Sequence, residues 1–494
     1  MMRVGSPLLL LGGLTAVAAV LRVVGLDSEL WYDEIKTLVE YVRKPLPEIV
    51  TQYSKSNHIL YTVLAHASLS LFGDHPWSLR LPAMLFGVLS VPALYALGVL
   101  MTSRLEACLA AGLLAVSYHH IWFSQDARGY TALVFWSLVT SICLLRGLQE
   151  ERVGWPIAYG ITAVLGIYTH VSMLFLVATQ LLLSIVRPWE REKPSSPSRF
   201  PVVAGTLVTV LSVLLYAPVA MELFSAFHPA SPDPQVQVAT FHWALREAFQ
   251  GLSTGLGLSG TILCCLLAAL GCWCYWKQRR LLAALFVLPG LLMAASLATV
   301  PSPMRPRFFF MFVGFGFLMA ARGAWLAAGW IFSRWPVRDD GHLTQAAGAC
   351  SLVGVLMLAN LVSLEFLYQH PKQSYQAALQ YLDTVGTDED AVVTAGFAVM
   401  PYRDYYGRTW QGIATGDELH AAGAHQGRVW MVYSLLDYVE RPLASLIEQK
   451  CPPVQSFGGT LRGGEVVVCR LRSRTSETSW TGNTEGPARS VSGE

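Results

Sequence analysis

The stretch Trp31-Tyr32-Asp33-Glu34 follows closely on the first long apolar segment of the chain, Pro7–Val24. Further along, Ser56-Asn57-His58-Ile59-Leu60-Tyr61 stands just before the sequence becomes apolar again. Ionisable side chains at the ends of membrane helices are costly to keep there and commonly mark functional sites. We therefore expect the region between residues 25 and 77 to form one wall of an active site at a membrane surface.

The composition of the 494-residue chain indicates a membrane protein. Hydrophobic residues make up 53% of the chain, charged residues 14%, and the mean hydropathy is +0.43. Soluble globular proteins carry about 25% charged residues, so this chain is too apolar to be water-soluble throughout. The net charge of +2 gives no reason to expect a nucleic-acid partner, and membrane lipids are the expected surroundings.

Apolar segments long enough to cross a bilayer, which takes roughly 20 residues, recur along most of the sequence. The shortest of them are Trp155–Tyr168 and Val171–Val186. We expect an α-helical polytopic membrane domain over residues 1–368 with about eleven transmembrane helices. The expected spans are Pro7–Val24, Ser78–Leu100, Leu105–Trp122, Thr131–Leu148, Trp155–Tyr168, Val171–Val186, Val202–Leu223, Leu256–Trp276, Leu281–Val300, Phe308–Trp325 and Ala346–Leu364.

The distribution of basic residues predicts a cytoplasmic N-terminus, because cytoplasmic loops carry an excess of Lys and Arg. One set of alternate loops is rich in them, with Arg104, Arg146 and Lys277 among its members. The short loops of the opposite set hold only Arg128, Arg246, Arg305 and Arg307. An odd number of spans then places the C-terminus outside. Most of the unusual polar residues share that side, so we expect an extracytoplasmic activity.

Beyond Tyr368 the sequence changes to that of a small soluble α/β domain, expected over residues 369–471. This length, roughly 100 residues, is usual for one domain. The tail 472–494 is rich in Ser, Thr, Gly and Glu and is expected to be disordered. Strands are expected at Ala391–Ala395, Val429–Tyr433, Val454–Phe457 and Glu465–Leu471, and helices at Gln373–Thr384 and Tyr438–Glu448.

Two cysteines, Cys451 and Cys469, fall in this polar region. They can form a disulfide if the domain is extracytoplasmic, and the sequence leaves their pairing open.

Three acidic residues are candidates for catalysis. Asp33 and Glu34 are neighbours, and neighbouring side chains on a helix point about 100° apart, so both cannot face one reacting atom. One of them would act, while the other orients it, binds a cation or faces solvent. A solvated pair in a loop is the alternative. Asp126 lies in Ser124-Gln125-Asp126-Ala127-Arg128-Gly129-Tyr130, where it can also cap the helix that follows.

Arginines at helix starts indicate an anion site. Arg305 and Arg307 lie in Pro303-Met304-Arg305-Pro306-Arg307-Phe308-Phe309, directly before a predicted span. The helix dipole disfavours cations there but favours an anion bound among arginines and backbone N–H groups. Arg128 stands in the same relation to its helix, and capping does not explain it. The further polar residues Lys55, Asn57, His58 and His170 are candidates for the site or interfacial groups without such a role.

One reaction fits carboxylates combined with arginines at a bilayer surface. The arginines hold a lipid-linked phosphate ester, and a carboxylate deprotonates an incoming hydroxyl. Phosphate as a leaving group needs charge stabilisation rather than a general acid, so one base is enough for an inverting displacement. A transporter or flippase of a lipid-linked sugar is the alternative, although it predicts mid-span polar residues and repeated halves, which the sequence lacks. A non-catalytic assembly protein leaves the acids and arginines unexplained.

These residues resemble the GT-C superfamily of polyprenyl-phosphate-sugar-dependent glycosyltransferases. The branch they resemble contains the protein O-mannosyltransferases, the lipid A aminoarabinose transferase and bacterial mannosyltransferase-like proteins. The ordered series of motifs runs over nearly the whole chain. It comprises Gly25-Leu26, Leu30-Trp31-Tyr32-Asp33-Glu34, Asn57-His58-Ile59-Leu60-Tyr61, Leu71-Phe72-Gly73, Leu79-Arg80-Leu81-Pro82-Ala83, Phe123-Ser124-Gln125-Asp126-Ala127-Arg128-Gly129-Tyr130, Tyr168-Thr169-His170, Pro306-Arg307-Phe308 and Asp404-Tyr405-Tyr406.

The resemblance implies an inverting glycosyltransferase of the bacterial inner membrane that moves one sugar from a polyprenyl phosphate to an extracytoplasmic protein, lipid A or polysaccharide. It implies that Asp33 activates the acceptor hydroxyl and that Asp126 is the second outer-face acid. Glu34 is the remaining catalytic candidate. The residues expected to bind the donor phosphate are Arg305, Arg307, Lys55 and Arg128. Those expected to bind substrate are Asn57, His58, Tyr61 and His170.

Two departures from the family pattern limit what the resemblance implies. Many relatives carry two prolines after the first-loop histidine, where this chain has Ile59-Leu60. The Trp-Trp-Asp-Tyr-Gly signature of oligosaccharyltransferases is absent, which disfavours transfer of a whole glycan. Some relatives bind a divalent cation and others do not, so the cofactor requirement and any metal ligands are left unassigned.

Overall fold

The computed structural model describes residues 7–150, 152–186, 199–227, 241–299, 305–333, 341–425 and 427–472. The chain divides into two compact units. The first contains residues 1–28 and 37–369, and the second contains Glu29–Lys36 together with residues 370–494. The tail beyond residue 472, expected to be disordered, lies outside the described residues.

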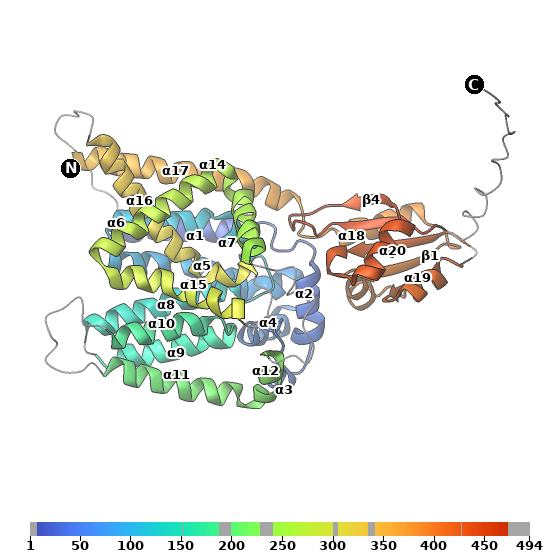
Figure 1. Cartoon of the computed structure of the whole chain (residues 1–494), viewed down its shortest axis with the longest axis horizontal. Coiled ribbons are helices and arrows are strands. Elements are labelled where there is room, and N and C mark those ends of the chain that lie inside the picture. The colour runs from blue at the N-terminus through green and yellow to red at the C-terminus, as the bar shows by residue number, and fades with distance from the viewer. Residues whose placement is uncertain are drawn as a thin grey trace, which may run out of the picture. The chain divides into compact units, whose positions relative to one another are not determined.

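The first unit is a bundle of α-helices (Figure 1). Within the described residues, every apolar segment that the sequence predicts to span the membrane coincides with helical structure. The helices are α1 (Pro7–Val23), α4 (Ile59–Phe72), α5 (Pro76–Met101), α6 (Arg104–Val116), α7 (Tyr118–Ser124), α8 (Tyr130–Gln149), α9 (Gly154–Thr169), α10 (Met173–Ile185), α11 (Phe200–Tyr216), α12 (Ala220–Phe227), α14 (Phe241–Gln278), α15 (Arg280–Thr299), α16 (Val313–Phe332) and α17 (Gly341–Gln369).

The number of helices that can cross a membrane on their own is smaller than the predicted number. Among the described residues, seven are long and apolar enough, or eight if the bent pair α6 and α7 is one span. The difference from about eleven arises because several predicted segments form short helices, such as α10 with 13 residues and α9 with 16. A straight helix needs roughly 20 residues to cross a bilayer.

The predicted span Leu105–Trp122 is broken at Ser117, where α6 and α7 meet at 56°. A break frees backbone carbonyls, which must find donors inside a membrane protein. Arg22 of α1, which is fully buried, supplies them: its guanidinium donates to the carbonyls of Leu114 at 3.1 Å and Ala115 at 2.9 Å. The buried arginine is therefore part of the scaffold that holds α7.

The region between residues 25 and 77, predicted as a loop, is largely helical. It contains α2 (Tyr32–Thr37), a π-helical turn (Leu38–Val42), α3 (Leu46–Thr51) and α4. Within the first unit, the buried Arg80 of α5 donates to the carbonyls of Leu26 and Ser28, each at 2.8 Å. Arg80 thus fixes the start of this region to the helical bundle.

The second unit contains a mixed five-stranded sheet in the order β2-β1-β3-β5-β4. β1 pairs in parallel with β2 and β3, whereas β5 runs antiparallel to β3 and β4. All four predicted strands and both predicted helices are present; β2 and α19 were not predicted. The elements are α18 (Tyr375–Val385), β1 (Ala391–Gly396), β2 (Gln411–Ile413), α19 (Gly416–Ala422), β3 (Val429–Ser434), α20 (Arg441–Lys450), β4 (Pro453–Phe457) and β5 (Val466–Arg470).

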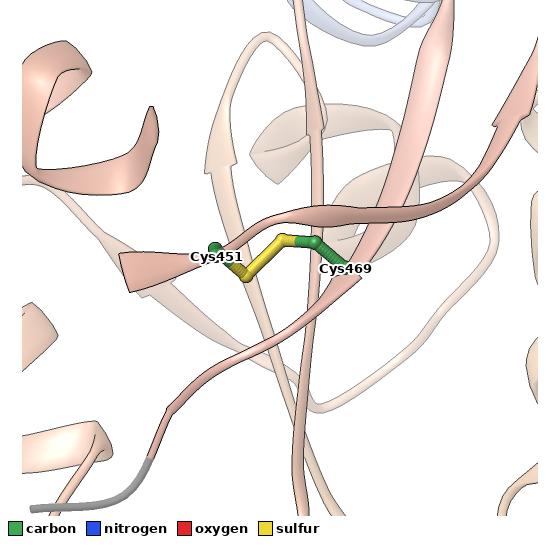
Figure 2. Close-up of a disulfide and its surroundings, with 2 residues drawn as sticks. All are labelled: Cys451 and Cys469. Atoms are coloured by element: carbon green, nitrogen blue, oxygen red, sulfur yellow. A yellow bond between two sulfur atoms is a disulfide. The ribbon is translucent and has the colours of Figure 1, made fainter. Parts of the chain in front are cut away.

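A disulfide joins Cys451 to Cys469 (Figure 2). Cys451 ends α20 and Cys469 lies on β5, and their Cα atoms are 5.4 Å apart. Both residues are fully buried in the core between the sheet and its helices. The bond ties the last helix of the domain to its sheet.

Candidate functional site

Three of the predicted site residues line one cavity of the first unit. They are Lys55, Asn57 and His170, and they come from two segments that are far apart in the sequence. The remaining lining residues are Tyr53, Ile59, Tyr168, Thr169, Val171 and Tyr216. A cavity lined by a lysine, a histidine and several tyrosines offers hydrogen bonds and charge to a polar group. Its volume of about 20 Å³ is close to that needed by a single water molecule.

His58 lies beside this cavity at the N-terminal end of α4 and is buried. Its Nδ1 accepts a hydrogen bond of 2.9 Å from the backbone N–H of Gly129. Its ring meets the ring of His170 edge-on, with centroids 4.9 Å apart, and the ring of Tyr130 at 5.0 Å. The histidine predicted from the first loop thus contacts the Ser124–Tyr130 motif and the end of α9.

His170 follows α9 and is half-buried. Its Nδ1 accepts from the backbone N–H of Ser172 at 3.1 Å, and the Ser172 hydroxyl lies 2.7 Å away. Its ring also contacts Phe308, with centroids 5.7 Å apart. Because both histidines accept at Nδ1, each neutral imidazole carries its proton on Nε2 and can donate it to a ligand.

Both histidines are held in the neutral form. Burial lowers the pKa of His58 well below its usual value, and His170, Arg128 and Arg307 lower it further. Burial lowers the pKa of His170 to about 4, with Arg307 and Arg128 adding to the effect. The positive charge near the two rings is therefore carried by arginines, and the imidazoles serve as neutral hydrogen-bonding groups.

The arginines predicted to bind phosphate come from two segments of the chain. Arg128 lies between α7 and α8, is buried, and donates from its guanidinium to the carbonyl of Ser56 at 2.6 Å. Arg305 and Arg307 flank Pro306 at the start of the 3-10 helix η3 (Pro306–Phe312), and both are half-buried. Arg128 precedes Gly129, whose N–H donates to His58, and Arg307 precedes Phe308, whose ring contacts His170. Both arginines therefore adjoin the two histidines in the fold.

Asn57 and two further predicted residues of this unit, Asp126 and Tyr61, differ in their surroundings. Asp126 is buried, and its backbone carbonyl accepts from the N–H of Arg128. Asn57 is buried and accepts at Oδ1 from the Thr62 hydroxyl at 2.7 Å. Tyr61 is buried and donates its hydroxyl to the carbonyl of Leu79 at 2.7 Å, a contact that joins α4 to α5. Tyr61 is not among the residues that line the cavity.

Sequence reasoning missed the tyrosines of the cavity. Tyr216 stands at the end of α11 and donates its hydroxyl to the carbonyl of Ile167 at 2.8 Å. Its ring lies 5.7 Å from that of Tyr168 and 6.5 Å from that of Tyr53. A lone tyrosine at the end of an apolar segment is typical of any membrane interface, so no local signal distinguishes these three.

Asp33 and Glu34 belong to the second unit, on the short helix α2. Asp33 is half-buried, whereas Glu34 is fully buried. The Glu34 carboxylate accepts from the backbone N–H of Trp31 at 3.3 Å and lies 3.9 Å from the ammonium of Lys372. The two neighbouring acids therefore have unlike environments. Among the residues that the structure describes, no group of three or more His, Cys, Asp or Glu is placed to hold a metal ion.

Comparison with known proteins finds a family that part of the chain resembles. Residues 57–216 match the family model of dolichyl-phosphate-mannose-protein mannosyltransferase. The matched region includes His58, Arg128 and His170. This match covers 160 of the 494 residues and supports the glycosyltransferase class that the motifs indicate. The resemblance inferred from its motifs is thereby confirmed. No curated protein matches the chain in sequence.

Solved structures share the fold of the chain. ArnT from Cupriavidus metallidurans in the apo state has a TM-score of 0.54 and 14% identity, over 93% of this chain and 97% of that one. ArnT bound to undecaprenyl phosphate has a TM-score of 0.50 and 13% identity, over 94% and 97%. Archaeal oligosaccharyltransferase AglB from Archaeoglobus fulgidus, in complex with an inhibitory peptide and a dolichol-phosphate, gives 0.54 and 11%, over 89% and 72%.

Proposed function

We propose that this glycosyltransferase moves a single sugar from a polyprenyl-phosphate donor to an extracytoplasmic acceptor, with inversion at the anomeric carbon. The family match over residues 57–216 supports a lipid-phosphate-linked donor. ArnT, which shares the fold over nearly its whole length, has been solved with undecaprenyl phosphate bound. The acceptor class is a protein, lipid A or a polysaccharide.

The observation that carries this proposal is the cluster of Arg128, Arg307, His58 and His170. Two guanidiniums and two neutral imidazoles with Nε2–H groups form a set of hydrogen-bond donors. Charge-assisted hydrogen bonds from arginine are well suited to a phosphate. A leaving phosphate gains negative charge as the bond to the sugar breaks, so groups arranged in this way stabilise the transition state.

The proposed chemistry needs one base. Asp33 takes the proton of the acceptor hydroxyl, whose oxygen attacks the anomeric carbon as the bond from that carbon to the phosphate oxygen breaks. The electron pair of that bond leaves with the polyprenyl phosphate. Lys55 and Arg305 add positive charge for the donor phosphate, Asn57 contacts the donor, and Asp126 is the second acid of the outer face.

We further propose that the protein lies in a bacterial inner membrane, with its N-terminus cytoplasmic and its C-terminal unit extracytoplasmic. The basic residues of alternate loops support this orientation. The disulfide between Cys451 and Cys469 supports it independently, because disulfides persist in oxidising compartments. The short apolar helices α1, α9 and α10 complete about eleven spans in this topology.

The test uses purified protein in lipid nanodiscs with a panel of polyprenyl-phosphate sugars. Donor binding and release of polyprenyl phosphate are measured for the wild type, Asp33→Asn and the double variant Arg128→Gln/Arg307→Gln. Asp27→Asn is the matched control, because Asp27 is a nearby exposed acid of the same outer region. We expect release by the wild type and the control, donor binding without release by Asp33→Asn, and loss of donor binding by the double arginine variant.

Two results would count against the proposal. Full activity of Asp33→Asn rejects Asp33 as the base. Donor binding without release from any donor, unaffected by Asp33→Asn, favours the transporter instead. In that case the same purified protein, reconstituted into sealed vesicles, should move the lipid-linked sugar across the bilayer.

A further inference from the structure

The segment that carries Asp33 is bound to the α/β domain, which is formed by residues 370–472 of the second unit. Its residues Glu29–Lys36 group with the C-terminal unit. The backbone N–H of Tyr32 donates to Oε1 of Gln373 at 3.0 Å, and the Tyr32 ring lies 4.4 Å from that of Phe397. A backbone hydrogen bond and a ring contact from one residue fix both the path and the rotation of the segment.

A second attachment holds the start of the segment. The Glu29 carboxylate accepts from the backbone N–H of Gln376 at 2.9 Å, in the first turn of α18. A carboxylate at a helix N-terminus is stabilised by the unsatisfied N–H groups and the dipole. The segment is therefore held by the α/β domain before α2 as well as along it.

The buried ion pair between Glu34 and Lys372 lies at the centre of these contacts. The Glu34 side chain has no exposed surface and that of Lys372 is 7% exposed, and the two charges are 3.9 Å apart. Glu34 also accepts from the Trp31 N–H, and the Lys372 ammonium lies 5.8 Å from the centre of the Trp31 ring. A buried pair of this kind fixes geometry more than it stabilises the fold, because desolvation offsets much of its attraction.

Lys372 itself stands on a well-anchored stretch of the domain. The Lys372 carbonyl accepts from the N–H of Leu461 at 3.0 Å. The next residue, Gln373, donates from its side chain to the carbonyl of Gly464 at 3.0 Å. The Ser374 hydroxyl donates to the carbonyl of Gly458 at 2.6 Å. The ammonium that meets Glu34 is thus carried by backbone held on the loop between β4 and β5.

We propose that Glu34 and Lys372 are positioning residues, which set the direction of the Asp33 carboxylate from the α/β domain. Adjacent side chains on a helix diverge by about 100°, so fixing Glu34 in the domain fixes the direction of Asp33. This inference rests on the proposed role of Asp33 as the base. It makes the C-terminal unit part of the machinery for proton transfer, in addition to any role in binding the acceptor.

Single and double variants of the Glu34–Lys372 ion pair are expected to differ. Removing only one charge leaves the other buried without its partner, which disturbs the segment more than removing both. A displacement of the base by about 1 Å can lower a rate by up to roughly a hundredfold. We therefore expect Lys372→Met to lower kcat by roughly ten- to a hundredfold with little change in KM for the donor. The double variant Glu34→Gln/Lys372→Met should lose less.

The experiment uses the full chain in nanodiscs and two readouts. The first is kcat and KM for polyprenyl phosphate release by Lys372→Met, Lys372→Arg, Glu34→Gln and the double variant. The second is amide hydrogen exchange of residues 31–34, which needs no donor. Arg408→Met is the matched control, because Arg408 forms an exposed ion pair of 3.1 Å with Asp383 on the same domain. Such surface pairs contribute little.

The inference is supported if Lys372→Met lowers kcat alone, speeds exchange at residues 31–34 and not in the sheet, and is partly rescued by Lys372→Arg. It is overturned if Lys372→Met behaves like Arg408→Met in both readouts. If Lys372→Met loosens the whole domain, Glu34→Gln decides, because a folded Glu34→Gln protein with wild-type kcat overturns the inference.

The proposed function can fail separately from this inference. A wild type that releases polyprenyl phosphate from no donor defeats the transferase and, with it, any role of the pair in proton transfer. Exchange at residues 31–34 then still decides whether the ion pair holds the segment.

Discussion

The backbone N–H of Gly129 donates a hydrogen bond of 2.9 Å to Nδ1 of His58, a residue 71 positions earlier in the chain. This contact joins two polar motifs of the first unit, Ser56–Tyr61 and Ser124–Tyr130. It also explains why a glycine stands in the Ser124–Tyr130 motif. A Cβ atom at residue 129 would lie 2.9 Å from His58 Nδ1 and 2.7 Å from Cγ2 of Thr169, closer than real Cβ contacts.

Gly129→Ala is therefore expected to displace His58 and weaken donor binding. Forcing an extra methyl group into a packed site typically costs about 1–3 kcal/mol. If that cost falls on the bound state, donor affinity drops by roughly ten- to a hundredfold, as measured by titration of a polyprenyl phosphate in nanodiscs. Gly154→Ala is the control, because nothing lies within 4 Å of a Cβ there. Equal affinity of both variants for the polyprenyl phosphate would contradict the prediction that a side chain at residue 129 displaces His58.

The neutral histidines predict how stability depends on pH. The folded state holds the pKa of His170 at about 4 and that of His58 well below its usual value. The unfolded chain has ordinary histidines with a pKa of about 6.5, so it binds more protons between these values. The free energy of unfolding should therefore fall as the pH is lowered from about 6.5 to about 4, with no contribution from these groups above that window.

The measurement is the thermal midpoint of the detergent-solubilised protein across this pH range. The variant His58→Gln/His170→Gln removes both titrating groups and should show a shallower decline toward pH 4. A slope as steep as that of the wild type would assign the acid sensitivity to other groups.

The arginines predict the strength of donor binding. A hydrogen bond to a charged group contributes about 1.5–3 kcal/mol, so Arg128→Gln and Arg307→Gln should each weaken donor binding by roughly ten- to a hundredfold. Arg307→Lys keeps the charge but loses the forked geometry and should recover only part of the loss. Arg152→Gln is the control, because the Arg152 side chain is 82% exposed beside Glu150. A donor affinity that is insensitive to Arg128 and Arg307 would remove them from the phosphate site.

The helices could be predicted from the sequence, because long apolar runs are local signals. The sequence also singled out His58 and His170, whose rings are in contact in the structure. The continuity of the helices could not be predicted. The break at Ser117 depends on Arg22, which comes from a different helix. Arg22 donates hydrogen bonds to the carbonyls that the break leaves without helical partners. Strand β2 has only three residues, Gln411–Ile413, too few to show the alternation that marks a strand.

The different environments of Asp33 and Glu34 also could not be predicted from the sequence. A neighbouring pair of acids predicts only that the two carboxylates diverge. Which of them is buried depends on Lys372, which is more than 300 positions away and stands in a stretch without a recognisable motif. Long-range pairing of this kind needs the folded chain, because one sequence records no contact between distant residues.

The disulfide predicts a measurable share of the stability of the C-terminal unit. Cys451 and Cys469 are separated by 18 positions, and closing a loop of that length stabilises a fold by about 3 kcal/mol. Cys451→Ser/Cys469→Ser should therefore unfold the domain at lower denaturant, followed by the fluorescence of Trp430 and Trp410. Cys265→Ser, which changes an exposed unpaired cysteine, is the control. Stability that is unchanged by the double replacement would show that the bond is dispensable.

A close contact between two helices of the first unit predicts a large effect of a small substitution. Gly271 of α14 and Gly323 of α16 face each other so closely that a Cβ on Gly271 would overlap the carbonyl of Met319, and a Cβ on Gly323 that of Leu267. Small residues allow such approach between membrane helices, and backbone atoms cannot move aside as a flexible side chain can.

Gly271→Ala and Gly323→Ala should therefore each force α14 and α16 apart, with a loss of at least about 1–3 kcal/mol. The expected result is a lower thermal midpoint and less folded protein recovered in detergent. Gly354→Ala, in α17, is the matched control because a Cβ there meets nothing within 4 Å. A helix-favouring alanine should leave that variant as stable as the wild type or slightly more so. If all three variants behave alike, α14 and α16 do not pack as closely as their glycines allow.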